Sequence, residues 1–246
     1  MSTLAGDASF YEGQDLEALA DIPNYYQWIL ANFREHLKGK VIEIGAGLGN
    51  LSALYAESVA RLLLVEPARN LHQQLANRFA SNQNITIRCG LLDELHAEEL
   101  ASPGIHGAPY DAGLLVNVLE HVENDLQMLR QLFDLLRLGG ALLLFVPALP
   151  FLYGALDSRV GHVRRYTRTG LAEVVGQAGF KLELLKYFDA IGVLPWLIAG
   201  RVLRRGRHSE RAAHIYDRFV VPIGRALESQ FPPPLGKNLI LIARRA

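Results

Sequence analysis

The 246-residue sequence has very little cysteine and no excess of charge of either sign. Its single cysteine, Cys89, excludes an intrachain disulfide and is typical of a protein in a reducing compartment. The 25 basic and 25 acidic residues give a formal net charge of zero, whereas nucleic-acid-binding proteins usually carry a basic excess or a basic stripe. We therefore expect no nucleic-acid partner.

Long hydrophobic segments are also missing from the sequence. Residues 1–10 have neither the basic stretch nor the apolar stretch of a secretory signal. The longest apolar run without charge, residues 190–200, is shorter than the roughly 20 residues that span a bilayer. We therefore expect a cytoplasmic protein. Half of its residues are hydrophobic, which is enough to bury one large core.

The sequence does contain short apolar runs that alternate with longer helix-like stretches. This alternation predicts a parallel sheet covered by helices on both faces. The expected strands are residues 41–44, 62–65, 85–88, 112–116, 141–146, 181–187 and 238–244. The expected helices are residues 51–58, 70–80, 125–136 and 169–178. We expect Gly139 and Gly140 to end the third of these helices.

About fifty residues separate the last two expected strands, too many for a hairpin loop, so they predict a helical insertion. Its apolar run 190–200 is followed by arginines at positions 201, 204, 205, 207 and 211. This pattern fits a peripheral membrane contact through residues 189–211. It also fits a buried helix or a homodimer contact whose arginines reach water, and we favour this second interpretation.

A glycine-rich turn follows the first expected strand, with Gly45, Gly47 and Gly49 spaced as G-x-G-x-G. Glycines permit a tight turn and a close approach of ligand to backbone, and the following helix presents free N–H groups there. The alternative is a plain strand-to-helix turn. Dinucleotide sites prefer G-x-G-x-x-G, so the spacing speaks against a nicotinamide dehydrogenase.

Glu66 ends the second expected strand, beside the glycine turn. A carboxylate at this place can accept hydrogen bonds from both hydroxyls of a ribose. The alternative is a solvated loop carboxylate. We favour the ribose, because Glu66 directly follows a fully apolar run.

The sequence resembles the class I methyltransferases that use S-adenosylmethionine (SAM). The resemblance lies in the glycine turn, in Glu66 and in the stretch Asn117-Val118-Leu119-Glu120-His121. The resemblance covers residues 38–146 well and the last strand loosely. It implies a doubly wound, Rossmann-like α/β fold with a seven-stranded, mostly parallel sheet. In that fold the last strand is antiparallel and lies between the fifth and the sixth.

The resemblance also implies the cofactor and its contacts. The methionine part of SAM is expected against the glycine turn, its ribose on Glu66 and its adenine beside residues 91–93. Many relatives have Gly-Asp at this last point, whereas here Asp93 follows Gly90 by three positions. The expected cofactor-binding residues are Glu43, Gly45, Gly47, Gly49, Asn50, Glu66, Pro67, Leu92, Asp93, Asn117 and Val118. We assign no metal ligands.

Residues 157–167 follow the fifth expected strand, and ligands of such sheets bind beyond the carboxyl ends of strands. We therefore expect this loop to wall the acceptor pocket. His162 can take a proton from a hydroxyl, and His121 is the second candidate for this catalytic role. The alternative role for Glu120 and His121 is a helix-capping pair, which we slightly favour over catalysis.

The same loop provides the expected substrate contacts. The residues concerned are Tyr153, Arg164, Arg165 and Tyr166, with the arginines holding an anionic group. The alternative is a structural loop whose arginines pair with carboxylates and whose Thr167 caps the next helix. A similar Gly-His-x-Arg-Arg-Tyr stretch occurs in bacterial methyltransferases associated with glycan, lipid and natural-product assembly.

These features predict a SAM-dependent methyltransferase that acts on a small-molecule or lipid- or glycan-type acceptor, through a hydroxyl. One alternative is a non-catalytic SAM-fold module recruited to a membrane or a partner, and another is an NAD-dependent dehydrogenase. We expect one domain over residues 1–246. Its parts are an N-terminal helical cover (1–38), a SAM-binding core (39–188), a helical insertion (189–237) and the last strand (238–246).

Overall fold

The computed structural model describes residues 22–104, 106–198 and 210–246. The first part of the expected N-terminal cover lies outside the described residues, and so do the arginines expected at 201, 204, 205 and 207.

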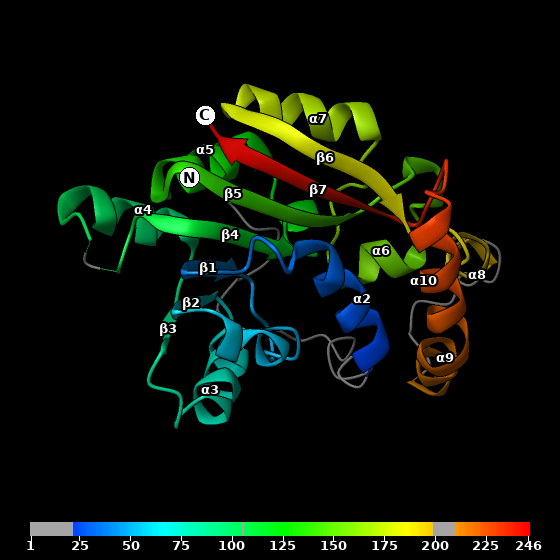
Figure 1. Ribbon diagram of the computed structural model, residues 1–246, viewed down its shortest axis with the longest axis horizontal. Helices are drawn as coiled ribbons and strands as arrows, with labels where there is room; N and C mark the ends of the chain where they lie inside the picture. Colours follow the sequence, from blue (N-terminus) through cyan, green and yellow to red (C-terminus); the bar gives the residue numbers. More distant parts are fainter. Residues whose placement is uncertain (1–21, 105, 199–209) are drawn as a thin grey trace.

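Seven strands form one sheet in the order β3-β2-β1-β4-β5-β7-β6 (Figure 1). They are β1 (Lys40–Ile44), β2 (Arg61–Glu66), β3 (Ile85–Cys89), β4 (Tyr110–Val116), β5 (Leu136–Pro147), β6 (Phe180–Phe188) and β7 (Asn238–Arg245). The first five run parallel, whereas β7 is antiparallel to both β5 and β6. This arrangement confirms the predicted fold, and each expected strand lies within an observed one.

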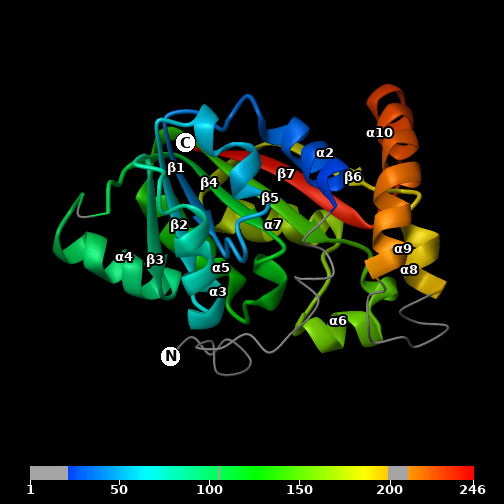
Figure 2. The ribbon, with the colours of Figure 1, turned by 90° about the horizontal axis from the view of Figure 1, so that it is seen from below.

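Helices pack on both faces of the sheet (Figures 1 and 2). Buried side chains from α4 (Leu92–Ala101), α5 (Asp125–Leu135) and α7 (Arg168–Gln177) cover one face. The other face is covered from α2 (Pro23–Phe33), α3 (Arg69–Arg78), α10 (Val221–Gln230) and the short turns η1 (Ser52–Leu54) and η2 (Ala56–Ser58). The remaining described helices are η3 (Leu119–His121), η4 (Pro150–Leu152), α6 (Ala155–Val160), α8 (Val193–Trp196), α9 (Glu210–Ile215) and the π-helix η6 (Tyr216–Val220).

The amphipathic pattern of α5 explains its place in the core. Its Leu129, Leu132 and Leu135 recur at helical spacing and are buried against the sheet. The helix begins where the side chain of Asn124 accepts a hydrogen bond from the backbone N–H of Gln127. The expected helix at this place is therefore confirmed.

The expected end of this helix is wrong. The helix ends at Leu135, and the chain passes directly into β5, so Gly139 and Gly140 lie within the strand. Gly139 has a φ of 73°, and a Cβ on Gly140 would lie 2.8 Å from a backbone oxygen. The two glycines therefore permit a tight bend of the strand, because side chains would be strained or obstructed there.

The expected helix over residues 51–58 is also corrected, since the chain forms the two short 3₁₀ turns η1 and η2 instead. Residues three apart in such turns lie on one side, and the hydroxyls of Ser52 and Tyr55 both donate to Glu43. Among the helices that the structure describes, none is long and apolar enough to cross a membrane.

The strand order places the ligand crevice. Strand β1 lies between β2 and β4, so the connections from these strands leave toward opposite faces of the sheet. At such a switch point the loops beyond the carboxyl ends of the strands separate and leave a crevice. In this chain those loops begin at Gly45, Pro67 and Asn117.

Candidate active site

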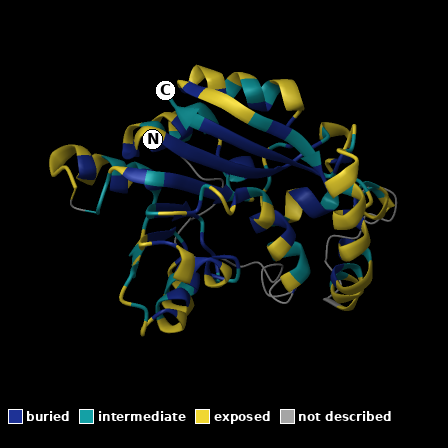
Figure 3. Cartoon of the chain, viewed as in Figure 1, coloured by how far each residue is buried: buried dark blue, intermediate teal, exposed yellow. Residues whose placement is uncertain are grey.

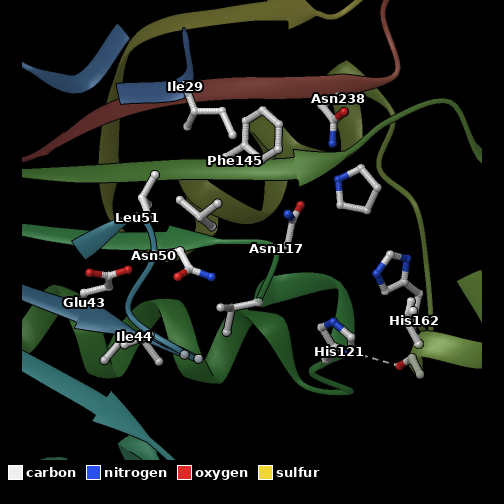
Figure 4. A pocket seen from close by; sticks show the side chains of 18 of the residues that line it. Ile29, Glu43, Ile44, Asn50, Leu51, Asn117, His121, Phe145, His162 and Asn238 are labelled. Atoms are coloured by element: carbon white, nitrogen blue, oxygen red, sulfur yellow. Dashed lines mark hydrogen bonds between the residues drawn. The ribbon is translucent and has the colours of Figure 1, made fainter. Parts of the chain in front are cut away.

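A cavity of about 980 Å³ opens at the carboxyl edge of the sheet (Figure 4). Its walls come from the glycine turn, from the ends of β1, β2, β4 and β5, and from α2, α6, α8 and α9. Most of the expected cofactor residues line it, namely Glu43, Gly45, Gly47, Asn50, Glu66, Pro67, Leu92, Asp93, Asn117 and Val118. The residues that sequence reasoning assigned to one ligand therefore meet in one cavity.

The glycine turn has a left-handed backbone at each of its three glycines, with φ values of 70°, 56° and 73° at Gly45, Gly47 and Gly49. The first two line the cavity, whereas Gly49 does not. A Cβ on Gly49 would lie 2.6 Å from the side chains of Leu75 and Phe79. We infer that this third glycine lets α3 and the chain after it pack against the turn.

Glu66 is buried at the end of β2 and is held by two backbone groups. Its Oε2 accepts a hydrogen bond from the N–H of Gly47 at 2.8 Å, and its Oε1 accepts one from the N–H of Ala68 at 2.9 Å. Burial raises the pKa of this carboxyl above its ordinary value. Each oxygen keeps a further lone pair, so the carboxylate can accept two hydroxyl groups without moving.

Glu43 is buried under the glycine turn and accepts hydrogen bonds from Ser52 Oγ at 2.7 Å and Tyr55 Oη at 2.6 Å. Burial raises its pKa to about 7, although both hydrogen bonds act in the opposite direction. Asn50 lies beside it in the cavity wall and accepts from the guanidinium of Arg78. Through the hydroxyls of Ser52 and Tyr55, Glu43 connects the turns η1 and η2 to the end of β1.

The end of β4 turns sharply into the cavity. Asn117 has a φ of 53°, which is uncommon for a residue with a Cβ and marks a backbone that the surroundings hold in place. The next residue, Val118, lies so close to the glycine turn that a Cβ on Gly45 would come within 2.5 Å of it. Figure 4 shows Asn117 pointing toward the middle of the cavity.

His121 and His162 line the other end of the cavity, with ring centroids 4.8 Å apart. Nδ1 of His121 lies 3.2 Å from the backbone oxygen of Gly161, which can only accept, so this nitrogen carries the proton (Figure 4). Nδ1 of His162 likewise donates to Oδ1 of Asp157 at 2.9 Å. In the neutral form of both rings, Nε2 is therefore the acceptor. Burial, with His162 nearby, lowers the pKa of His121 to about 4.

Glu120 lies next to these rings and is fully buried. Neither of its carboxylate oxygens has a hydrogen-bond partner within the described residues, and Oε1 lies 3.7 Å from Nε2 of His162. Burial raises its pKa to about 8. The Glu120 side chain does not cap η3, whereas His121 bonds the carbonyl of Gly161 at the end of α6, so the capping interpretation of this pair holds for His121 alone.

Arg165 lines the cavity, but its charge is already paired. Its Nε donates to Oδ1 of Asp157 at 2.8 Å, and its Nη1 donates to the backbone oxygen of Ala148 at 3.0 Å. Asp157 thus accepts from both Arg165 and His162, and these partners keep its pKa below the ordinary value despite burial.

The other three expected substrate residues do not line the cavity. Arg164 pairs with Asp125 at 2.8 Å, and Tyr166 donates to the same carboxylate at 2.9 Å. Tyr153 donates to the backbone oxygen of His162 at 2.7 Å. These contacts, together with the predicted cap of α7 by Thr167, match the structural alternative for this loop. Substrate contact by Tyr153, Arg164 and Tyr166 stays a prediction.

Sequence reasoning missed a cluster that closes the cavity from the insertion and the N-terminal helix. Lys237 pairs with Asp189 at 3.0 Å and lies over the rings of Tyr25 and Trp196, at 5.0 and 5.3 Å from their centroids. Tyr216 also donates to Asp189. In the sequence, only the aromatic residues of the N-terminal segment pointed to this cluster. They predicted helices that cover the sheet and not a wall of the cavity.

A family model described as a methyltransferase domain matches residues 15–185. No protein among the curated ones matches the sequence. The fold resembles that of a putative methyltransferase from Bacillus halodurans, with 14% identity, a TM-score of 0.59, and coverage of 88% of this chain and 98% of that one.

Two further solved structures have the same fold. One is a SAM-dependent methyltransferase from Mesorhizobium loti, with 16% identity, a TM-score of 0.58, and coverage of 89% of this chain and 98% of that one. The other is the N-methyltransferase NodS from Bradyrhizobium japonicum in complex with S-adenosyl-L-homocysteine. It has 14% identity, a TM-score of 0.58, and coverage of 98% of this chain and 93% of that one.

Proposed function

The chain belongs to the family of methyltransferase domains, and we propose that this SAM-dependent methyltransferase acts on a hydroxyl group of a small-molecule, lipid or glycan acceptor. Family membership sets aside the dehydrogenase and the non-catalytic module as alternatives. The compartment, the domain division and a homodimer stay predictions.

The glycine-turn end of the cavity fits SAM. Gly45 and Gly47 line the cavity without side chains, and Glu66 is held with two acceptor positions to spare. When bound, SAM supplies a methyl group activated by its positive sulfur. We propose that Gly45, Gly47 and Asn117 surround its methionine part and that Glu66 binds its ribose.

The observation that carries the proposal is the pair of imidazoles at the other end of the same cavity. In the neutral form of each ring Nε2 is the acceptor, because the Nδ1–H is engaged by Gly161 or Asp157. We propose that Nε2 of His162 accepts the hydroxyl proton and that Asp157 stabilises the resulting imidazolium. His121 has its pKa lowered to about 4 and stays neutral near pH 7, so it can accept a hydrogen bond but holds a proton poorly.

The paired arginines change the expected chemistry of the acceptor. The charge of Arg165 is paired with Asp157, and Arg164 lies outside the cavity wall, so neither offers an anion an unpaired positive charge. The wall near the histidines includes Leu156, Val160 and Trp196. We therefore propose an acceptor that is apolar or aromatic next to its reacting hydroxyl, with an anionic group not required.

The cofactor assignment predicts a selective loss at Glu66. Isothermal titration is expected to show SAM binding at micromolar level and NAD binding far more weakly. Replacement of Glu66 by alanine removes charged hydrogen bonds and is expected to weaken SAM binding by about 1.5–3 kcal/mol.

Two further variants complete this titration. Glu66→Gln separates loss of charge from disorder of the turn, and Glu57→Ala is the matched control, because Glu57 is an exposed carboxylate outside the cavity wall. Binding of NAD as tight as that of SAM would contradict the assignment.

A further inference from the structure

We propose that Glu120, His121 and His162 bind a divalent transition-metal ion at the acceptor end of the cavity. One potential ligand atom from each of the three lies within 4.8 Å of the other two. The inference rests on the proposed function only for what the ion does to the acceptor, because the ligands of the ion come from these three side chains.

Glu120 is the first reason for the inference. In its charged form this fully buried carboxyl is costly, because burial removes its water and no hydrogen-bond donor from another described residue replaces it. The guanidinium of Arg165 is directed at Asp157 and Ala148 instead. A cation between Glu120 and the two rings would supply the missing partner.

The histidines are the second reason. Histidines that bind metals usually donate their other ring N–H to a carboxylate or a backbone carbonyl, which fixes the ring and its tautomer. His162 has such a carboxylate in Asp157, and His121 has such a carbonyl in Gly161. Both rings are thus oriented by outer partners with Nε2 left available.

The ligand set indicates the kind of ion. Two imidazole nitrogens and one carboxylate suit zinc, iron and neighbouring transition metals, whereas magnesium and calcium prefer oxygen ligands throughout. Three protein ligands leave at least one coordination position for a substrate atom. His121 and His162 line the cavity, so this open position can face the acceptor.

An ion at this point would activate the acceptor as a Lewis acid. The hydroxyl oxygen coordinates the ion, which lowers the hydroxyl pKa, and the proton leaves to water. A lone pair of that oxygen attacks the methyl carbon of SAM, and the broken carbon–sulfur bond leaves its electron pair on sulfur. The ion is neither oxidised nor reduced, and it takes over the activation that the metal-free imidazole of His162 would provide.

Titration with Co²⁺ tests the site without any acceptor, because cobalt bound by nitrogen and oxygen ligands absorbs visible light. The wild-type protein is expected to bind a single Co²⁺ with a saturable visible band that Mg²⁺ does not displace. Asp157→Asn is expected to weaken Co²⁺ binding by about 10–100-fold, and Glu120→Gln by more than that, since it removes a ligand rather than its outer partner.

Glu123→Gln is the matched control, because it removes one carboxylate charge from an exposed position on the same loop. Wild-type protein without saturable Co²⁺ binding, or Glu120→Gln protein that binds Co²⁺ as the wild type does, overturns the inference. Titration of the same samples with SAM separates the outcomes. Intact SAM binding without Co²⁺ binding leaves the proposed function standing, with His162 as the proton acceptor.

A second, independent observation concerns the outer side of the helix formed by α9, η6 and α10. Large apolar side chains stand exposed at every fourth position along it, the last one directly after its end, and we name them the apolar stripe: Ile215, Phe219, Ile223, Leu227 and Phe231. Their exposed fractions range from 51% to 73%. Figure 3 shows this helix exposed on its outer side, in contrast to the buried central strands.

Arginines flank the apolar stripe. Arg211, Arg218 and Arg225 are exposed and lie seven positions apart, which places them along one line of the helix. The inner side of the same helix includes Ala212 and Tyr216, which line the cavity. One helix therefore bounds the cavity and presents an apolar face with a basic edge to the outside.

We infer that the apolar stripe lies on the surface of a bilayer that contains anionic lipids. An apolar face edged by arginines matches acyl chains and acidic headgroups at the same time. A second copy of the chain fits less well. Among the described side chains of this helix, the acidic ones are engaged internally: Asp217 accepts from Tyr25, and Glu228 accepts from the backbone of Ala190. The arginines of one copy would therefore find no unengaged carboxylate among the described side chains of the same helix in the other.

Cosedimentation with vesicles of phosphatidylserine and phosphatidylcholine tests this surface. The wild type is expected to bind and to be released by high salt, whereas the double variant Phe219→Ser with Ile223→Ser is expected to lose most of its binding and to keep its SAM affinity. Leu100→Ser is the matched control, because Leu100 is also exposed but lies on α4, at the opposite end of the molecule (Figure 1).

Three results would overturn this second inference. The first is the absence of vesicle binding by the wild type, and the second is vesicle binding that the double variant retains. The third is a wild-type dimer in solution that the double variant converts to a monomer, which would assign the stripe to self-association.

Discussion

Replacement of Gly47 by valine is expected to abolish measurable SAM binding while the protein stays folded. The φ of 56° at this position costs a β-branched side chain about 1–2 kcal/mol in the left-handed region. The added methyl groups would also stand in the cavity wall, where the cofactor is proposed to lie. Isothermal titration measures the loss, and circular dichroism shows whether the fold is intact.

Gly107→Val is the control for backbone strain. Gly107 has a φ of 93°, and a Cβ there would meet no atom within 4 Å, so this variant is strained without touching the cavity. It is expected to bind SAM as the wild type does. If the Gly47 variant also kept its affinity, the glycine turn would serve only as a turn between β1 and η1.

Replacement of His162 by alanine is expected to lower kcat by about 10²–10⁴, the range for loss of a positioned general base. The result holds for both proposals, because direct proton transfer and ion binding use the same Nε2. The affinity for SAM is expected to stay unchanged, since the glycine turn and Glu66 lie at the other end of the cavity. The assay is formation of S-adenosylhomocysteine with a hydroxylated acceptor identified by screening.

His72→Ala is the control for this measurement, because His72 lies on α3 outside the cavity wall. An alanine variant of His162 that turned over near the wild-type rate would remove this residue as both base and ligand. His121 or the positioning of the substrates would then have to account for the rate.

The cofactor end of the site was predictable because its parts are local in sequence. Two short signals were enough. The glycine turn directly follows one buried strand, and the carboxylate of Glu66 lies directly at the end of the next strand, so each depends on a few consecutive residues. The parallel sheet then brings both to the same edge. Gly49 shows the limit of such reasoning, since the pattern alone does not say whether a glycine faces a ligand or, as here, Phe79.

The acceptor end was less predictable because its parts meet only through the tertiary fold. Whether an arginine is free depends on its neighbours, and the carboxylate of Asp125 that engages Arg164 lies 39 positions away in sequence. The role of Glu120 likewise depends on the lack of a hydrogen-bond donor for its carboxylate among the described residues, and no sequence motif encodes this lack. The pairing of Lys237 with Asp189 joins the two ends of the insertion.

The place of β7 in the sheet has a consequence for synthesis of the protein. Within the described residues β6 pairs with β7 alone, and β7 follows it by about fifty residues. A ribosome that adds about 5–20 residues per second needs roughly 3–10 seconds to make this interval. During that time the nascent chain presents β6 and the open edge of β5 without their shared neighbour. We expect this enzyme to depend on chaperones at that stage of translation.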